Sequence, residues 1–255
     1  MQRIGTLLLL SLLTTGCAIQ SPLRGDQESL SSVKKQTLIQ EADQLNNLGT
    51  QAYKKGDYPR AIENYLKSIQ IKERILGETH LSTATSYNNL GLAYKRVGEQ
   101  QKALAYINQA LKIRESILGR VDSQTAESYN NLGTFYASLG DNQKAIDFTQ
   151  KTIKIKDQII HKEQIDTAIS HNNLAILYEK EGKNKEALKE YFKALKINEN
   201  VFGKDHPVTH NSYKNIALLY YTMGNYPEAQ RYAKLAQKEP EKIELEPIEV
   251  TPQSP

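Results

Sequence analysis

The sequence predicts an all-α protein, a solenoid of about five helix-turn-helix units. Three observations predict this fold. A pattern recurs every 42 residues, apolar residues are spaced as on one face of a helix, and a glycine returns at one position of each unit. The 255 residues, 39% hydrophobic and 24% charged, suffice for one array with a continuous core.

The repeat can be read directly from the chain. Copies begin at residues 46, 88, 130, 172 and 214 and read NNLGTQAYKKGDYPRAI, NNLGLAYKRVGEQQKAL, NNLGTFYASLGDNQKAI, NNLAILYEKEGKNKEAL and KNIALLYYTMGNYPEAQ. Five copies at a constant spacing indicate units that stack, because each unit exposes apolar surface until a neighbour covers it. We assign residues 36–238 to the array, with its first helix beginning near Gln36.

Each unit is expected to hold two helices, A and B. In the second unit Tyr87, Leu90, Gly91 and Tyr94 fall at i, i+3, i+4 and i+7, which is one face of helix A. Gly98 follows, and glycine is favoured there because the residue after a last turn often has a left-handed backbone. Helix B of this unit then directs four residues inward: Ala103, Ile107, Ala110 and Ile113.

Small residues recur where the two helices of a unit are expected to cross. Helix A carries one in every unit: Gly49, Gly91, Gly133, Ala175 and Ala217. Helix B carries an alanine in every unit: Ala61, Ala103, Ala145, Ala187 and Ala229. A glycine inside a helix costs about 1 kcal/mol relative to alanine, so its recurrence indicates that helix B passes very close to helix A.

The order of small residue, aromatic residue, turn glycine and alanine, as in Gly91, Tyr94, Gly98 and Ala103, resembles the signature of tetratricopeptide repeats. The resemblance covers about 200 residues. The 42-residue period and the GKDHP linker at 203–207 resemble the kinesin light chain subfamily. This resemblance implies a right-handed superhelix whose A helices line the concave side, and a protein that binds other proteins and is not an enzyme.

The amino terminus has the plan of a secretory signal peptide over residues 1–16. Arg3 precedes an apolar run from Ile4 to Leu13, which at about ten residues is shorter than the roughly 20 needed to span a bilayer. The sequence LTTGC at 13–17 resembles the lipobox of bacterial lipoproteins, which implies that Cys17 is lipidated. The alternative is a plain cleaved signal followed by an incidental cysteine.

Both flanks of the array have expected roles. Residues 17–35 would carry the lipid and tether the array, and Ala18 after the cysteine implies, by resemblance to Gram-negative lipoproteins, the outer membrane. We therefore expect a cell-envelope lipoprotein that faces the periplasm; an inactive leader would leave a cytoplasmic form. Residues 239–255 contain four prolines and scattered apolar residues among acids, so we expect a disordered tail.

Asparagine pairs in helix A are the candidate binding residues. The resemblance places the second asparagine of each pair in the concave groove: Asn47, Asn89, Asn131, Asn173 and Asn215. A side-chain amide offers two donors and an acceptor, which suits the backbone of an extended peptide. The alternative is that these amides tie adjacent helices together, and both roles can coexist. Further along the same face are residues that vary between units: Tyr53, Lys95, Arg96, Lys180 and Tyr221.

Other classes of function find little support in the sequence. A formal charge of +4 lacks the dense basic footprint of a nucleic-acid-binding protein. HExxH, Walker, GxSxG and paired CxxC motifs do not occur, so we expect no catalytic residue, cofactor or small-molecule substrate. A metal or hydrolytic site at His206 and His210 is the rival reading, but Pro207 lies between them and no third ligand is apparent.

The expected function is a lipid-anchored scaffold that binds an envelope protein, or an extended peptide of it, in its concave groove. The alternative is a structural component of an envelope machine, in the manner of pilotins, which would use the convex B helices or the open fifth unit.

Overall fold

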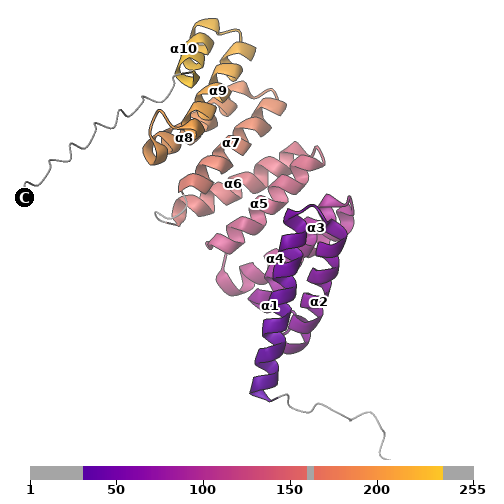
Figure 1. Ribbon diagram of the computed structural model, residues 1–255. Helices are drawn as coiled ribbons and strands as arrows, with labels where there is room; N and C mark the ends of the chain where they lie inside the picture. Colours follow the sequence, from indigo (N-terminus) through magenta and orange to yellow (C-terminus); the bar gives the residue numbers. More distant parts are fainter. Residues whose placement is uncertain (1–30, 160–163, 238–255) are drawn as a thin grey trace, which may run out of the picture.

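The computed structural model describes residues 31–159 and 164–237 of the chain. These residues form ten α-helices and no strand, which confirms the predicted all-α array. The helices follow one another in chain order from one end of the array to the other (Figure 1). Their bounds are α1 (Ser32–Lys54), α2 (Tyr58–Leu76), α3 (Leu81–Arg96), α4 (Gln100–Leu118), α5 (Ser123–Ser138), α6 (Asn142–Gln158), α7 (Gln164–Lys180), α8 (Asn184–Phe202), α9 (Pro207–Thr222) and α10 (Tyr226–Ala236).

Odd-numbered helices are the A helices of repeats 1 to 5, and even-numbered helices are the B helices. The turn between them is made as predicted: Gly98 has φ +83°, and the Glu99 amide donates to the Tyr94 carbonyl, which closes the end of α3. Close packing at the crossing is also confirmed. A Cβ added to Gly91 would lie 2.7 Å from Ile107 Cγ1 and 3.0 Å from the Ala103 carbonyl oxygen.

A recurring set of polar contacts joins helix B of one repeat to helix A of the next. A threonine hydroxyl donates to the carbonyl of the linker glycine in three pairs: Thr83 to Gly77, Thr125 to Gly119 and Thr209 to Gly203. A tyrosine hydroxyl donates to a glutamate in three pairs: Tyr87 to Glu73, Tyr129 to Glu115 and Tyr213 to Glu199. These contacts fix each repeat against the one before it.

A third junction contact runs from a long polar side chain of helix B to a serine of the following helix A. Lys72 Nζ lies 3.2 Å from Ser86 Oγ, and Arg114 Nη1 lies 2.8 Å from Ser128 Oγ. In the last junction an amide takes this place, with Asn198 Nδ2 2.8 Å from Ser212 Oγ. Lys72 and Arg114 are both only 2% exposed, and each buried charge is also paired with a carboxylate. Lys72 Nζ lies 2.8 Å from Asp43 Oδ1, and Arg114 Nη1 lies 3.4 Å from Glu127 Oε2.

One boundary differs from the prediction. Helix α1 begins at Ser32 and not near Gln36, because Ser31 accepts a hydrogen bond from the Lys34 amide and caps a helix that starts one turn earlier. Part of the predicted tether at 17–35 is therefore helical. Helix α10 ends at Ala236, and the predicted end of the array at residue 238 lies outside the described residues. The predicted leader at 1–16, Cys17 and the tail at 239–255 lie outside the described residues.

Candidate functional site

The predicted groove asparagines bond to one another across repeats. Asn131 Nδ2 lies 2.9 Å from Asn88 Oδ1, and Asn89 Nδ2 lies 3.4 Å from Asn46 Oδ1. In the last step Asn215 Nδ2 lies 2.8 Å from an oxygen of repeat 4, Oδ1 of Asn172. We call this set the asparagine ladder. The second asparagine of a repeat thus donates to the first asparagine of the preceding repeat.

The ladder is interrupted once. Asn173 of repeat 4 makes no such bond to Asn130 of repeat 3, although both residues are described. Asn47 of repeat 1 has no preceding asparagine pair and is exposed, whereas the later second asparagines are half-buried. The amides therefore take the helix-tying role that the sequence left open.

Groove binding remains chemically compatible with the ladder. A side-chain amide carries two N–H groups and an oxygen, and the bond from Asn131 to Asn88 uses a single N–H. Asn131 is also half-buried and not enclosed. The second N–H and the oxygen of the Asn131 amide are left for the backbone of a bound peptide. The hydrogen bond to Asn88 holds this amide in position.

Lys95 and Arg96 hold neighbouring repeats together. Lys95 Nζ donates to the Thr134 carbonyl of repeat 3 at 2.9 Å, and burial lowers the pKa of its ammonium, with Arg96 adding to the effect. Arg96 points to repeat 1 instead. Its Nη2 and Nε lie 2.6 and 2.9 Å from the hydroxyl of Tyr58, and its guanidinium lies 5.0 Å from the Tyr58 ring centroid.

The three remaining predicted residues have different surroundings. Tyr53 is half-buried and packs edge-on against Tyr58, with ring centroids 5.4 Å apart. Tyr221 is exposed and packs edge-on against Tyr226 at 5.5 Å. Lys180 is exposed. The structure therefore spreads the predicted site along the A helices and does not bring its residues into one pocket.

An apolar strip on the A helices adds residues to the predicted site. It follows the position after the small residue, and its exposure rises towards the carboxyl end: Leu92 and Ile176 are partly exposed and Leu218 is 57% exposed. The signal was present, since this position holds Thr50, Leu92, Thr134, Ile176 and Leu218. Partly exposed apolar residues at a fixed spacing indicate a contact surface more than isolated ones do.

Two of the histidines have structural roles at helix starts. His80 and His206 each begin a helix, where their Nδ1 accepts from the amides of Ser82 and Val208. His206 also stacks on Phe202. Within the described residues, no group of three or more potential metal ligands gathers.

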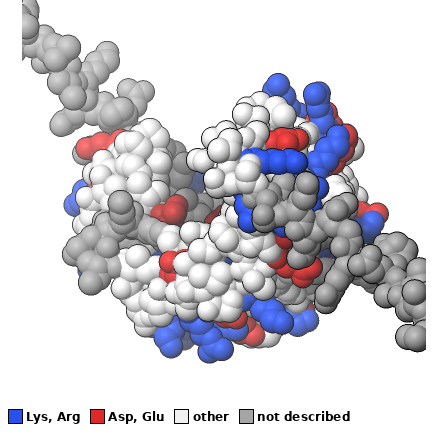
Figure 2. Space-filling view, turned by 90° about the horizontal axis from the view of Figure 1, so that it is seen from below, with Lys and Arg blue, Asp and Glu red and all other residues white. Residues whose placement is uncertain are grey.

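Charge on the surface is mixed in sign. In the view from below, lysine and arginine side chains alternate with acidic ones, and uncharged residues cover much of the face (Figure 2). None of the described helices combines the length and apolar character needed to cross a bilayer.

Comparison with known proteins decides the family. The tetratricopeptide repeat family model matches residues 41–116, 101–158 and 166–238, well over half of the chain. The chain belongs to the tetratricopeptide repeat family. Proteins of this family typically act as interaction scaffolds for other proteins. No curated protein matches the chain.

Solved structures show the same tetratricopeptide fold. Repeats of a putative kinesin light chain from Podosopora anserina match with a TM-score of 0.69 and 22% identity, covering 78% of this chain and 94% of that one. BtubC (BKLC) from P. vanneervenii matches with a TM-score of 0.68 and 20% identity over 80% and 87%. The pilF structure from Pseudomonas aeruginosa matches with a TM-score of 0.59 and 19% identity over 78% and 77%. At these identities the likeness concerns the fold.

Proposed function

We propose that this tetratricopeptide protein is a lipid-anchored scaffold of the bacterial envelope, which binds an extended segment of another protein along its A helices. The observation that carries the proposal is the pairing of the asparagine ladder with the apolar strip. Amide groups with unused hydrogen-bonding capacity lie on the same helices as partly exposed apolar residues. An extended peptide needs both, because its backbone seeks hydrogen bonds and its alternate side chains seek apolar surface.

The groove is tested by a crosslinked pull-down from envelope extract, with the full chain as bait. One variant replaces Asn89, Asn131 and Asn173 by alanine. Because Asn89 and Asn131 also tie helices together, a second variant, Ile176→Ser with Leu218→Ser, removes apolar surface without touching any hydrogen bond of the ladder. Capture by the wild type and loss with both variants supports the groove; equal capture by all three proteins refutes it.

The membrane anchor rests on the leader sequence and Cys17. Its test is incorporation of labelled palmitate by cells that express the full chain or the Cys17→Ser variant. Label on the wild type alone supports the anchor. Label on neither protein rejects it and favours the plain signal peptide. The orientation towards the periplasm is tested by protease protection in intact cells, where digestion of the array from outside would contradict it.

A structural part in an envelope assembly is the second candidate, favoured by the exposed apolar residues of repeat 5, Leu218 and Tyr221. Substitution of exposed B-helix residues, or deletion of residues 239–255, would weaken assembly under this candidate. Under the first candidate the same changes would leave peptide capture intact.

A further inference from the structure

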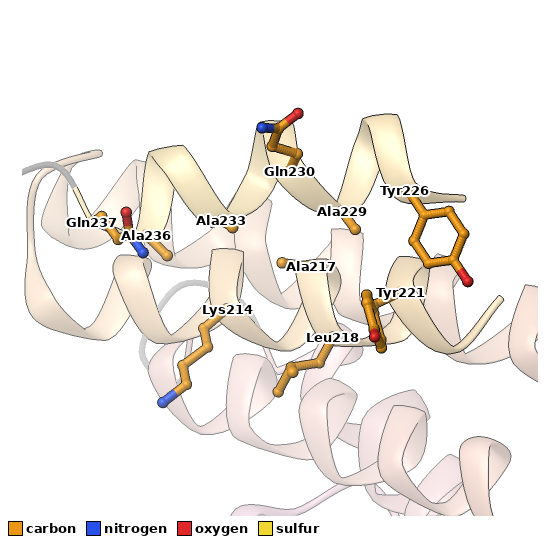
Figure 3. A pocket seen from close by; sticks show the side chains of 10 residues that line it. All are labelled: Lys214, Ala217, Leu218, Tyr221, Tyr226, Ala229, Gln230, Ala233, Ala236 and Gln237. Atoms are coloured by element: carbon orange, nitrogen blue, oxygen red, sulfur yellow. The ribbon is translucent and has the colours of Figure 1, made fainter. Parts of the chain in front are cut away.

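The last described repeat carries an open groove between its two helices. The cavity has a volume of about 690 Å³, with Lys214, Leu218 and Tyr221 of α9 on one wall and Tyr226 and Ala233 of α10 on the other (Figure 3). Repeat 1 has Tyr65 where repeat 5 has Ala233, so a smaller side chain lines the groove of repeat 5 at this position.

In earlier repeats the next helix A covers this groove. Ala110 and Ala194, the counterparts of Ala236 on earlier B helices, are 0% and 2% exposed, whereas Ala236 is partly exposed. No described helix follows α10. The groove therefore has the shape of a surface made to receive an A helix.

Repeat 1 shows how such a groove is filled. Its tyrosine pair, Tyr53 and Tyr58, has the same geometry as the pair in repeat 5, Tyr221 and Tyr226: interplanar angles are 67° and 69°. In repeat 1 the guanidinium of Arg96 from the incoming helix α3 covers Tyr58. In repeat 5 the two rings are 63% and 61% exposed.

A second contact of the incoming helix lies two turns earlier. Seven residues before Arg96, Asn89 of α3 meets Asn46. The counterpart of Asn46 in repeat 5 is Lys214, a donor that requires an oxygen opposite it. An incoming helix thus needs an oxygen-bearing side chain and, seven residues later, a cation.

Helix α1 carries this pair on an uncovered face. Asn47 and Lys54 are seven residues apart, at the positions of Asn89 and Arg96, and both are exposed. Beside them Leu48 is 50% exposed, although its counterpart Leu90 is 0% exposed because repeat 1 covers it. In the described part of the chain nothing precedes α1 to cover Leu48.

We propose that two copies of this chain associate head to tail, with α1 of one copy in the α9/α10 groove of the other. Lys54 takes the place of Arg96 over Tyr226, Lys214 donates to the Asn47 side-chain oxygen, and Leu48 enters the apolar part of the groove. The surface lies at the ends of the array and contains none of the hydrogen bonds of the asparagine ladder, although it shares Leu218 with the apolar strip. The variants below leave Leu218 in place, so the association is tested apart from peptide capture. Because the two faces differ, the association is heterologous. Further copies can add at either end, so it continues to longer assemblies unless the subunits close into a circular oligomer.

Sedimentation velocity of the full chain over a range of concentrations tests the association. We expect concentration-dependent dimers and longer species. Leu48→Asp should weaken the association at least about tenfold, since it places a charge in apolar surface. Tyr226→Ala should weaken it by about tenfold through loss of the ring and hydroxyl that receive Lys54. Ile117→Asp, at an equally exposed apolar residue far from both faces, is the matched control and should change nothing.

Mixing the two variants tests the polarity of the contact. Leu48→Asp disrupts only the α1 face, and Tyr226→Ala disrupts only the groove. In an equimolar mixture the intact α1 face of one variant can bind the intact groove of the other, which should form dimers that grow no further. A wild type that stays monomeric, or a mixture without dimers, overturns the proposal. Association that appears only after residues 238–255 are deleted would also overturn it, because the tail would then be the occupant of the groove. Circular dichroism confirms that each variant keeps its helices.

Discussion

His171 Nδ1 lies 2.6 Å from Glu190 Oε2, and both side chains are buried. In other repeats the same two positions hold a pair of aromatic rings: Tyr87 with Tyr106, Tyr129 with Phe148 and Tyr213 with Tyr232. Repeat 4 has therefore exchanged a ring pair for a polar pair at the same place in the fold. Lys193 completes the group with a 2.9 Å bond to Glu190 Oε1.

Restoring the ring pair should preserve or raise stability. The double variant His171→Tyr with Glu190→Phe copies repeat 3, and replacing a buried polar pair by well-packed apolar groups is often neutral or stabilising by about 1–4 kcal/mol. Glu190→Phe alone should lower the free energy of unfolding, since His171 loses its partner. Urea unfolding measures all three proteins. A double variant less stable than the single one would contradict the expectation.

Acid should weaken repeat 4 through Glu190. Burial raises the pKa of this carboxyl, but hydrogen bonds from His171 and Lys193 together outweigh burial and leave the pKa below its ordinary value of 4.5. The ionised carboxylate therefore stabilises the fold above about pH 4.5, and that contribution is lost as the pH falls below it. The urea midpoint of Glu190→Gln should accordingly depend less on pH between 5 and 3 than that of the wild type. Parallel curves would refute this.

Truncating Arg114 should be costly. Its guanidinium is 2% exposed and donates to the Gln124 carbonyl at 2.9 Å and to Ser128 Oγ at 2.8 Å. Arg114→Ala removes these two hydrogen bonds and the ion pair with Glu127 and opens a cavity, so we expect a loss of about 3 kcal/mol in urea unfolding. Arg114→Lys is the control. The junction between repeats 1 and 2 has Lys72 at the equivalent position, so this variant should retain most of the stability.

The glycines at the helix crossing should differ in their tolerance of alanine. A Cβ on Gly91 would meet the Ala103 backbone oxygen, so Gly91→Ala should destabilise by about 1–2 kcal/mol despite the better helix propensity. At Gly133 the nearest atom is the Thr149 side-chain oxygen at 3.0 Å, with the backbone at 3.5 Å. Gly133→Ala should remain within about 1 kcal/mol of the wild type. Equal losses in thermal unfolding would refute the distinction.

Alkaline conditions should loosen the junction between repeats 2 and 3. Burial, and then the hydrogen bond to Glu115, raise the pKa of Tyr129 from 10 to about 12. The neutral phenol thus contributes stability that is complete below pH 10 and lost as the pH rises towards 12. Tyr129→Phe should flatten the fall of the urea midpoint over this range, while Tyr136→Phe, a partly buried ring of the same repeat, serves as the control.

The period and the small residues allowed the fold to be predicted almost entirely. Buried Leu90, Ala103 and Ile107 lie where helical spacing put them, because repeated units impose the same packing on each copy. The start of α1 was wrong by one turn, since a single serine cap carries no periodic signal.

The site was less predictable. A sequence shows that Asn131 recurs but not that its amide bonds to Asn88, because side-chain direction depends on how far one repeat rotates against the next. The junction contacts of Arg114 and Lys72 were missed for a related reason. A charged residue reads as solvent-exposed until a partner is known to reach it.

Contacts between described helices join neighbours along the chain or the A helices of successive repeats, as in α1 with α3, α3 with α5 and α7 with α9. A load applied to the two ends of the described array passes through its junctions one after another, because no bond among the described helices bridges distant repeats. The described helices would separate in series: α10, the last and with eleven residues the shortest of them, would detach first, and the inner pairs would follow. Each detached helix pair contacts only its neighbouring repeats, so it can refold by packing against the repeat that is still folded. The array would therefore return to its original length once the load is released.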